Sequence, residues 1–160
     1  MQQLLNFTVA DTRLAIDLEG TRKVIPLVAL RPLPKPETCI AGLMNLGGAS
    51  VPVIDLALRL DFPNNNAYTL AASIVICLRE GQMFGIIADR IDGVCSVNDE
   101  AIELADVLRS DSMPYTGVYR SEQNCQILIL DLDKVLDLAC IVDSFPDLEQ
   151  SHTNTQNDVA

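Results

Sequence analysis

The sequence predicts a mostly β protein made of two related modules. Val, Ile and Leu supply most of the 49% apolar content, and they occur in short runs of the kind that form strands. Turn residues separate many of these runs, and the second half of the chain repeats the order of the first half. These observations favour a β-rich core shared by two related modules.

Length and charge limit the class of protein. A chain of 160 residues with ordinary Gly and Pro content fits one globular domain. The net charge is −11, of which −4 falls in residues 141–160, so the body carries −7 without a basic stripe. This balance argues against nucleic acid and anionic membranes as partners. No apolar run reaches a membrane span, and Met1-Gln2-Gln3 lacks the basic region of a secretory signal, so we expect a cytoplasmic protein.

In the first half, the pattern predicts a hairpin, a proline-punctuated extended stretch and a second hairpin. Gly47-Gly48 suits a two-residue turn, because glycine accepts positive φ without a Cβ clash. Both arms of this second hairpin are almost continuously apolar, so we expect them to be buried on both faces. The expected elements are strands at 4–9, 13–18, 40–46 and 50–54, extended segments at 24–26 and 28–33, one helical turn within 19–23, and a helix over 55–60.

The second half restarts in the same manner and ends in a helix opened by Asp131. Gly93 marks a candidate β-bulge. Residues 99–108 fit either a short helix or an extended segment. Residues 141–160 are polar and acidic, and we expect a disordered tail. The expected strands are 73–78, 83–88, 91–97, 113–120 and 125–130.

An internal repeat relates the two halves. The spacing from Gly42 to Asp55 nearly equals the spacing from Gly117 to Asp131, and the strand around Ile16 recurs in the second half. We therefore expect one domain over 1–140 made of two subdomains, 4–66 and 67–140. Because a module of this size buries little surface alone, the two should share a core.

The sequence contains little evidence for a catalytic site or a metal site. Asp55 and Asp131 invite comparison with an aspartic dyad, but they lack the small and hydroxyl neighbours of that site and fit helix N-caps instead. The single histidine, His152, lies in the tail, and no cluster has the spacing of a metal site. The five cysteines contain no C-x-x-C pair and are expected to be small buried residues in a reducing cytosol. The chain is therefore not expected to be an enzyme or to bind a cofactor or metal.

Several motifs resemble one known family. The run G-L-M-N-L-G-G-A-S-V-P-V-I-D-L from Gly42 is similar to the central motif of CheW-like domains, and matching motifs surround Ile16, Phe84 and Ile129. The resemblance covers residues 4–138. It implies two packed five-stranded SH3-like barrels with short capping helices. It also implies a non-catalytic adaptor that couples a chemoreceptor tip, or a substitute partner, to the regulatory domain of a CheA-type histidine kinase.

Two positions depart from the family pattern. Gly47 stands where many members have Arg, and Lys23 stands where they commonly have Glu. The resemblance implies that this acid–base pair lies beside the receptor-facing groove, so receptor recognition is expected to differ here. Val24 and the residue after it fit either a partner surface or ordinary core. The candidate partner-binding residues are Thr21, Lys23, Val24, Asn45, Leu46, Gly47 and Gly48.

A second function stays open from the residues alone. A stand-alone double barrel that binds a small molecule or a peptide outside chemosensory signalling would show the same patterning. Edge strands and grooves between small barrels serve either role.

Overall fold

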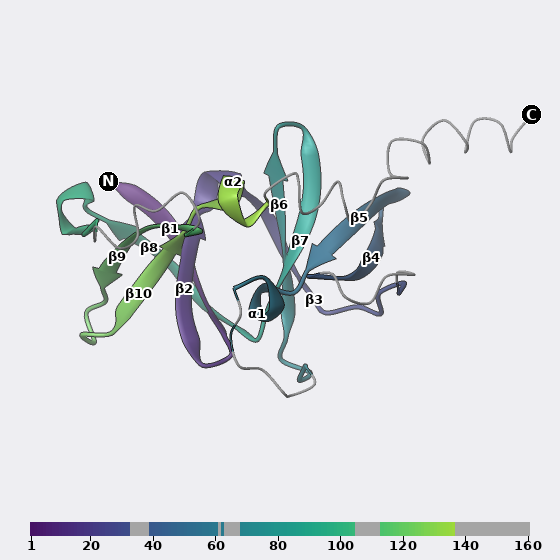
Figure 1. Cartoon of the computed structure of the whole chain (residues 1–160), viewed down its shortest axis with the longest axis horizontal. Coiled ribbons are helices and arrows are strands. Elements are labelled where there is room, and N and C mark those ends of the chain that lie inside the picture. The colour runs from purple at the N-terminus through teal and green to yellow at the C-terminus, as the bar shows by residue number, and fades with distance from the viewer. Residues whose placement is uncertain (33–38, 61, 63–67, 105–112, 137–160) are drawn as a thin grey trace, which may run out of the picture.

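Two five-stranded sheets lie side by side, with two short helices between them (Figure 1). The computed structural model describes residues 1–32, 39–60, 62, 68–104 and 113–136. The two five-stranded sheets confirm the predicted mostly β architecture. The strands are β1 (Gln2–Val9), β2 (Thr12–Asp17), β3 (Thr21–Pro26), β4 (Ile40–Leu46), β5 (Ala49–Ile54), β6 (Ser73–Arg79), β7 (Gln82–Ala88), β8 (Arg90–Val97), β9 (Tyr115–Arg120) and β10 (Gln126–Leu130). The α-helices are α1 (Leu56–Arg59) and α2 (Leu132–Val135), and the 3-10 turns are η1 (Leu18–Gly20) and η2 (Asp99–Ala101).

Each sheet draws strands from both halves of the chain. Barrel A has the order β8-β1-β2-β10-β9, and barrel B has the order β3-β6-β7-β5-β4. The predicted boundary between 66 and 67 therefore does not separate the two sheets. Within each repeat, consecutive strands still pair as hairpins. The long-range pairs, however, join β3 to β6 and β8 to β1. As a result, the third, fourth and fifth strands of each repeat lie in the same sheet as the first two strands of the other repeat.

The repeat itself is visible in the strand register. The parallel pairs match Ile129 of β10 with Ala15 of β2, and Val53 of β5 with Gly85 of β7. Ala15 and Gly85 occupy equivalent positions in the two repeats, since each precedes the isoleucine of a matching motif. The closing strand of each module thus pairs with the second strand of the other module.

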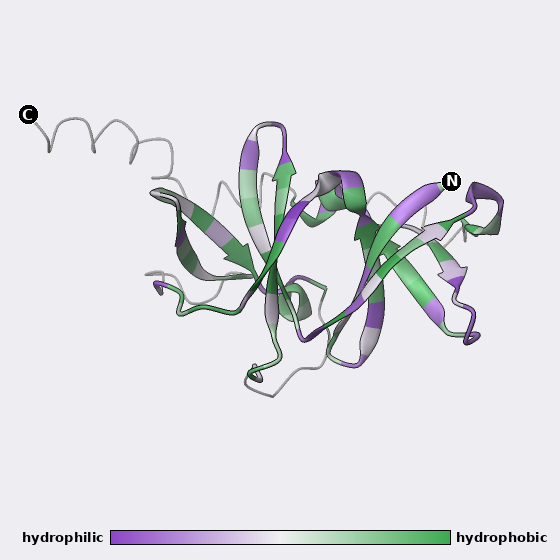
Figure 2. Ribbon diagram, turned by 180° about the vertical axis from the view of Figure 1, so that it is seen from behind, coloured by the Kyte–Doolittle hydropathy of each residue, from purple (hydrophilic) through white to green (hydrophobic). Residues whose placement is uncertain are grey.

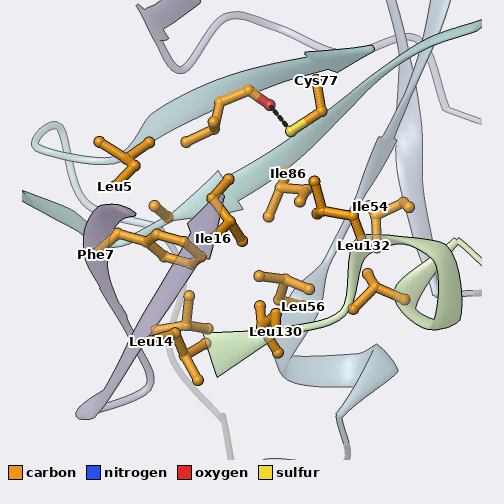
Figure 3. Packing of buried hydrophobic residues seen from close by; sticks show 14 of the residues in the cluster. Leu5, Phe7, Leu14, Ile16, Ile54, Leu56, Cys77, Ile86, Leu130 and Leu132 are labelled. Atoms are coloured by element: carbon orange, nitrogen blue, oxygen red, sulfur yellow. Dashed lines mark hydrogen bonds between the residues drawn. The ribbon is translucent and has the colours of Figure 1, made fainter. Parts of the chain in front are cut away.

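A shared core joins the two barrels, as the small size of each module predicted. Figure 3 shows side chains from both sheets and both helices converging, among them Phe7, Ile16, Ile86, Leu56 and Leu132. Phe7, Ile16 and Ile86 are fully buried. Two smaller clusters fill the barrel interiors, one around Leu4 and Ile129 and the other around Val53 and Ile76 (members of the second are Met44, Val51, Val53, Ile74, Ile76 and Ile87).

Among the described residues, one isolated backbone bridge closes each barrel. In barrel B, Arg31 and Leu43 exchange two hydrogen bonds of 2.8 and 3.0 Å, and in barrel A, Glu103 and Val118 exchange two of the same lengths. The residue before each bridged strand position is glycine. A Cβ on Gly117 would lie 2.7 Å from Ile102 Cγ2, so only glycine lets the closing segment approach this closely.

The central hairpin differs from expectation in its burial. Gly47 and Gly48 form the predicted two-residue turn, with φ of 58° and 91°, and Leu46 pairs with Ala49. Val53 and Ile54 at the end of β5 are both buried, as expected, but along β4 the buried positions alternate with partly buried ones. The reason is that β4 is the terminal strand of its sheet, so one of its faces covers the core and the other is partly solvated.

Both predicted aspartates open helices. The Asp55 carboxylate accepts from Leu58 N at 3.2 Å, and the Asp131 carboxylate accepts from Asp133 N at 3.0 Å. Asp55 also accepts a hydrogen bond from the Tyr68 hydroxyl. Burial, followed by this bond, raises the pKa of Tyr68 well above its usual range, so the phenol stays protonated.

Two arginines hold α2 against barrel B. Arg59 of α1 donates to the backbone oxygens of Lys134 and Val135, at 2.7 and 3.1 Å. Arg79 of β6 forms an ion pair with Asp133, which lowers the pKa of that exposed carboxyl. Because α2 follows directly from β10 of barrel A, both contacts link the barrels.

Other expectations meet mixed outcomes. Residues 19–23 contain a 3-10 turn that ends at Gly20, after which β3 begins. The ambiguous segment after residue 98 starts as a 3-10 turn and becomes extended at Glu103, while the rest of it and the tail lie outside the described residues.

The bulge at Gly93 is confirmed by a register shift against β1. Cys77 is buried as predicted, but Cys39, Cys95 and Cys125 are only partly buried, and Cys140 lies outside the described residues. Within the described ranges, no helix has the length and apolar character to span a membrane.

Gly117→Ala tests barrel closure. We expect a loss of about 1–3 kcal/mol in the free energy of unfolding, because the added methyl overpacks against the closing segment. Chemical denaturation measures this loss. The neighbouring exposed Thr116→Ala is the control and should stay within about 0.5 kcal/mol. Equal stability of Gly117→Ala and wild type would show that the closing bridge of barrel A tolerates a side chain at position 117.

Asp55→Ala and Asp131→Ala test the capping roles. Each should lose about 0.5–2 kcal/mol of unfolding free energy, while Asp55→Asn and Asp131→Asn should retain most of it, since Asn also caps helices well. Thermal and urea unfolding measure both pairs. An alanine variant that kept full stability but abolished a measurable turnover would contradict capping and revive the acidic dyad.

Candidate partner-binding surface

The candidate residues flank the seam of barrel B, defined here as the line where β3 and β4 meet as the barrel closes. These are the two terminal strands of the sheet. Ile25 of β3 and Leu46 of β4 both pack on the same interior cluster, so the two strands enclose one core. Residues 27–32 connect the two strands. Leu27 N donates a backbone hydrogen bond to Ala72 O, and Arg31 exchanges two backbone hydrogen bonds with Leu43.

On the β3 side, the structure separates core residues from exposed ones. Ile25 is partly buried, whereas Val24 is 41% exposed and Lys23 is exposed. Thr21 Oγ1 donates to Asp17 O at 3.4 Å and fixes the start of the strand. Thus the alternative that both apolar residues are core holds for Ile25 and not for Val24.

On the β4 side, the turn is ordered by its own polar side chain. Asn45 Oδ1 accepts from Gly48 N at 2.9 Å, while Leu46 turns inward onto the core. An added Cβ at Gly47 would have no atom within 4 Å. A side chain at this position would therefore project into solvent, and only the positive φ would oppose it.

The charge of this seam differs in sign from that of the whole protein. Residues 21–32 hold Arg22, Lys23 and Arg31 and no carboxylate, and residues 39–54 hold no charge. All three cations are exposed, and among the described residues none of them takes part in a salt bridge. Two exposed valines, Val24 and Val28, lie in the same stretch (41% and 43%). A cationic and apolar strip suits protein recognition.

The two aspartates of the candidate catalytic dyad serve as helix caps. Asp55 and Asp131 are occupied in capping separate helices, so they do not share a proton as a dyad would require. Over the described part of the chain, no three acidic, His or Cys side chains are placed to hold a metal ion. Figure 2 shows polar residues concentrated at the hairpin ends and apolar residues along the strands, the distribution of a packed scaffold.

Sequence reasoning missed part of this surface. The candidate segment 21–25 includes Arg22, but Val28 and Arg31, which lie in the same exposed strip, are not among the candidates. The signal was present: three basic residues and no acidic one within residues 21–32 of a strongly acidic chain.

Comparisons with known proteins agree with this geometry. A family model described as the CheW-like domain matches residues 3–140. The chain is similar to a chemotaxis protein CheW of Thermotoga maritima, with 26% identity over 137 residues, covering 84% of this chain and 87% of that protein. It is also similar to a chemotaxis protein CheW of Bacillus subtilis, with 26% identity over 147 residues, covering 91% and 94%.

A solved structure shares the fold. The scaffolding protein TtCheW from Thermoanaerobacter tengcongensis superposes with a TM-score of 0.72 at 25% identity, covering 82% of this chain and 84% of that one. Because the family model spans nearly the whole described body, with both barrels and both capped helices, this chain belongs to the CheW-like domain family.

Proposed function

We propose that this protein is a non-catalytic cytoplasmic adaptor of a chemotaxis-type signalling pathway. It couples the regulatory domain of a CheA-type histidine kinase to a chemoreceptor tip or to a substitute partner. The observation that supports this most is a CheW-like double barrel with an exposed seam that is both cationic and apolar.

Receptor recognition is the part of this function that we expect to be altered. In the family pattern, a Glu and an Arg flank this seam, whereas here Lys23 adds a third cation and Gly47 offers no side chain. Reversing the charge at one position changes which partners are steered in or excluded. A more acidic receptor tip or substitute partner would complement Arg22, Lys23 and Arg31.

Co-purification tests the adaptor role. We expect the tagged full chain, expressed in its native host, to capture a histidine kinase that carries a regulatory domain of the same fold, identified by mass spectrometry. A bound metabolite in native mass spectra without any kinase would instead support the stand-alone binding module.

The double substitution Lys23→Glu with Gly47→Arg tests altered recognition. Restoring the family pair should raise affinity for a typical receptor hairpin fragment, because Glu reverses the charge and Arg offers a planar five-donor group. Affinity for the kinase regulatory domain should stay within about threefold, or roughly 0.7 kcal/mol. Arg at the positive φ of residue 47 should cost about 1–2 kcal/mol of stability, so folding is checked by thermal unfolding.

Titration calorimetry against one receptor fragment measures the effect. Arg120→Glu changes the net charge by the same amount as Lys23→Glu but lies on barrel A, and it should leave receptor affinity unchanged. If wild type already binds in the low-micromolar range and the double variant is no tighter, then the two departures do not alter the partner.

A further inference from the structure

Barrel A has its own seam, where β8 and β9 meet, and a cavity of about 570 Å³ opens along it. Its walls come from the β8 strand on one side and from Tyr119 to Gln123, at the end of β9, on the other. By the internal repeat, Val94 of β8 corresponds to Val24 of β3. This cavity is therefore the counterpart in barrel A of the barrel B seam, on a separate surface.

The β8 strand presents its edge to this cavity. Every residue from Asp92 to Asn98 lines it. Because side chains alternate between the two faces of a strand, one face would contribute only every second residue. A continuous run means that the backbone edge itself borders the cavity.

That edge has unused hydrogen-bonding capacity. From Arg90 to Val97, β8 exchanges backbone hydrogen bonds with β1, and with no other described segment. Alternate residues of such an edge direct their N–H and C=O groups away from the paired strand. Across the seam, the described residues bridge β9 at Val118, through Glu103, and the cavity lies along the seam from Tyr119 onward.

The cavity lining has a definite chemistry. Arg13 and Arg120 both line it, and among the described residues neither belongs to an ion pair. Asp92 is already satisfied, since it pairs with Arg90 at 2.7 Å and accepts from Thr8 Oγ1 at 2.7 Å. Glu122 is the one other acidic residue of the described lining.

The remaining walls are apolar or internally bonded. Val94 is 57% exposed and stands on the edge strand, while Ile127 forms part of the barrel interior. Asn6 donates to Cys95 Sγ at 3.0 Å and accepts from the Tyr119 hydroxyl. These three polar side chains of the lining therefore satisfy one another's hydrogen bonds. Within the described lining, the β8 backbone edge, the exposed Val94 and the two arginines are therefore the groups on which a bound strand would draw.

We propose that the free edge of β8 binds an extended acidic peptide segment of a partner protein as an added β-strand. Backbone hydrogen bonds to β8 hold the strand, alternating apolar side chains contact Val94, and carboxylates reach Arg13 and Arg120. Strand addition of this kind draws affinity from the main chain and specificity from alternate side chains. The site lies apart from the barrel B seam and does not depend on the receptor recognition proposed there.

A designed probe tests the site on the full chain. The probe is a fluorescein-labelled nine-residue peptide that alternates valine and glutamate, titrated by fluorescence anisotropy. Two matched peptides replace glutamate by lysine or carry N-methyl groups on alternate amides. We expect each matched peptide to bind at least tenfold more weakly, because one loses the arginine contacts and the other loses strand pairing. Saturation with the first peptide should also slow amide exchange in β8 by at least tenfold.

Protein variants locate the site. Val94→Lys should weaken binding at least fivefold, while Val24→Lys, its repeat equivalent on β3, should leave binding within twofold. Arg13→Gln and Arg120→Gln should each weaken binding about threefold and flatten its salt dependence.

Several results would overturn the proposal. These are no binding up to about 1 mM, a weak affinity near −4 kcal/mol; equal binding of the N-methylated or lysine peptide; and an equal loss in Val24→Lys. Sedimentation that shows a dimer broken by Val94→Lys would assign the edge to a second copy of the chain and would also overturn it.

Discussion

The two barrels are held together by one core, and neither is complete without it. Neither sheet can bury its inner apolar residues alone, because Phe7 and Ile16 come from barrel A while Ile54 and Ile86 come from barrel B, and all four meet in one cluster. Exchanged strands secure this contact: each repeat contributes two strands to one barrel and three to the other. Separating the barrels would therefore require breaking backbone ladders as well as exposing apolar surface.

The exchange also explains why both barrels have an open edge. Each barrel has five strands and, among the described residues, one bridging residue pair. As a result, β3 and β8 each pair with a neighbouring strand on one side only. Open edges are normally protected, and here β3 carries Arg22, Lys23 and Pro26 while β8 carries a bulge at Gly93. These devices discourage indiscriminate pairing yet leave backbone and side chains available to a chosen partner. An adaptor needs such surfaces, since its function is recognition.

Rigidity between the barrels supports that function. Arg59 and Arg79 tie α2 to barrel B, although α2 is the direct continuation of barrel A. The Arg59 bonds are partly buried and end on backbone carbonyls, so they hold the helix more firmly than the exposed pair of Arg79 with Asp133. Partners bound at the two proposed seams would therefore be held at a fixed relative angle.

Features that arise from near neighbours follow from the amino-acid sequence alone. The Gly47-Gly48 turn, the hairpins, the aspartate caps and the repeat all come from local spacing, and the family motifs carried the fold class with them. Which repeat each strand joins is settled only in three dimensions, because the pairings of β3 with β6 and β8 with β1 are long-range and both modules offer equivalent partners. The exposure of Val24 and the free edge of β8 follow from those pairings. A side chain's burial depends on which strand lies beside it, and adjacent residues do not record this.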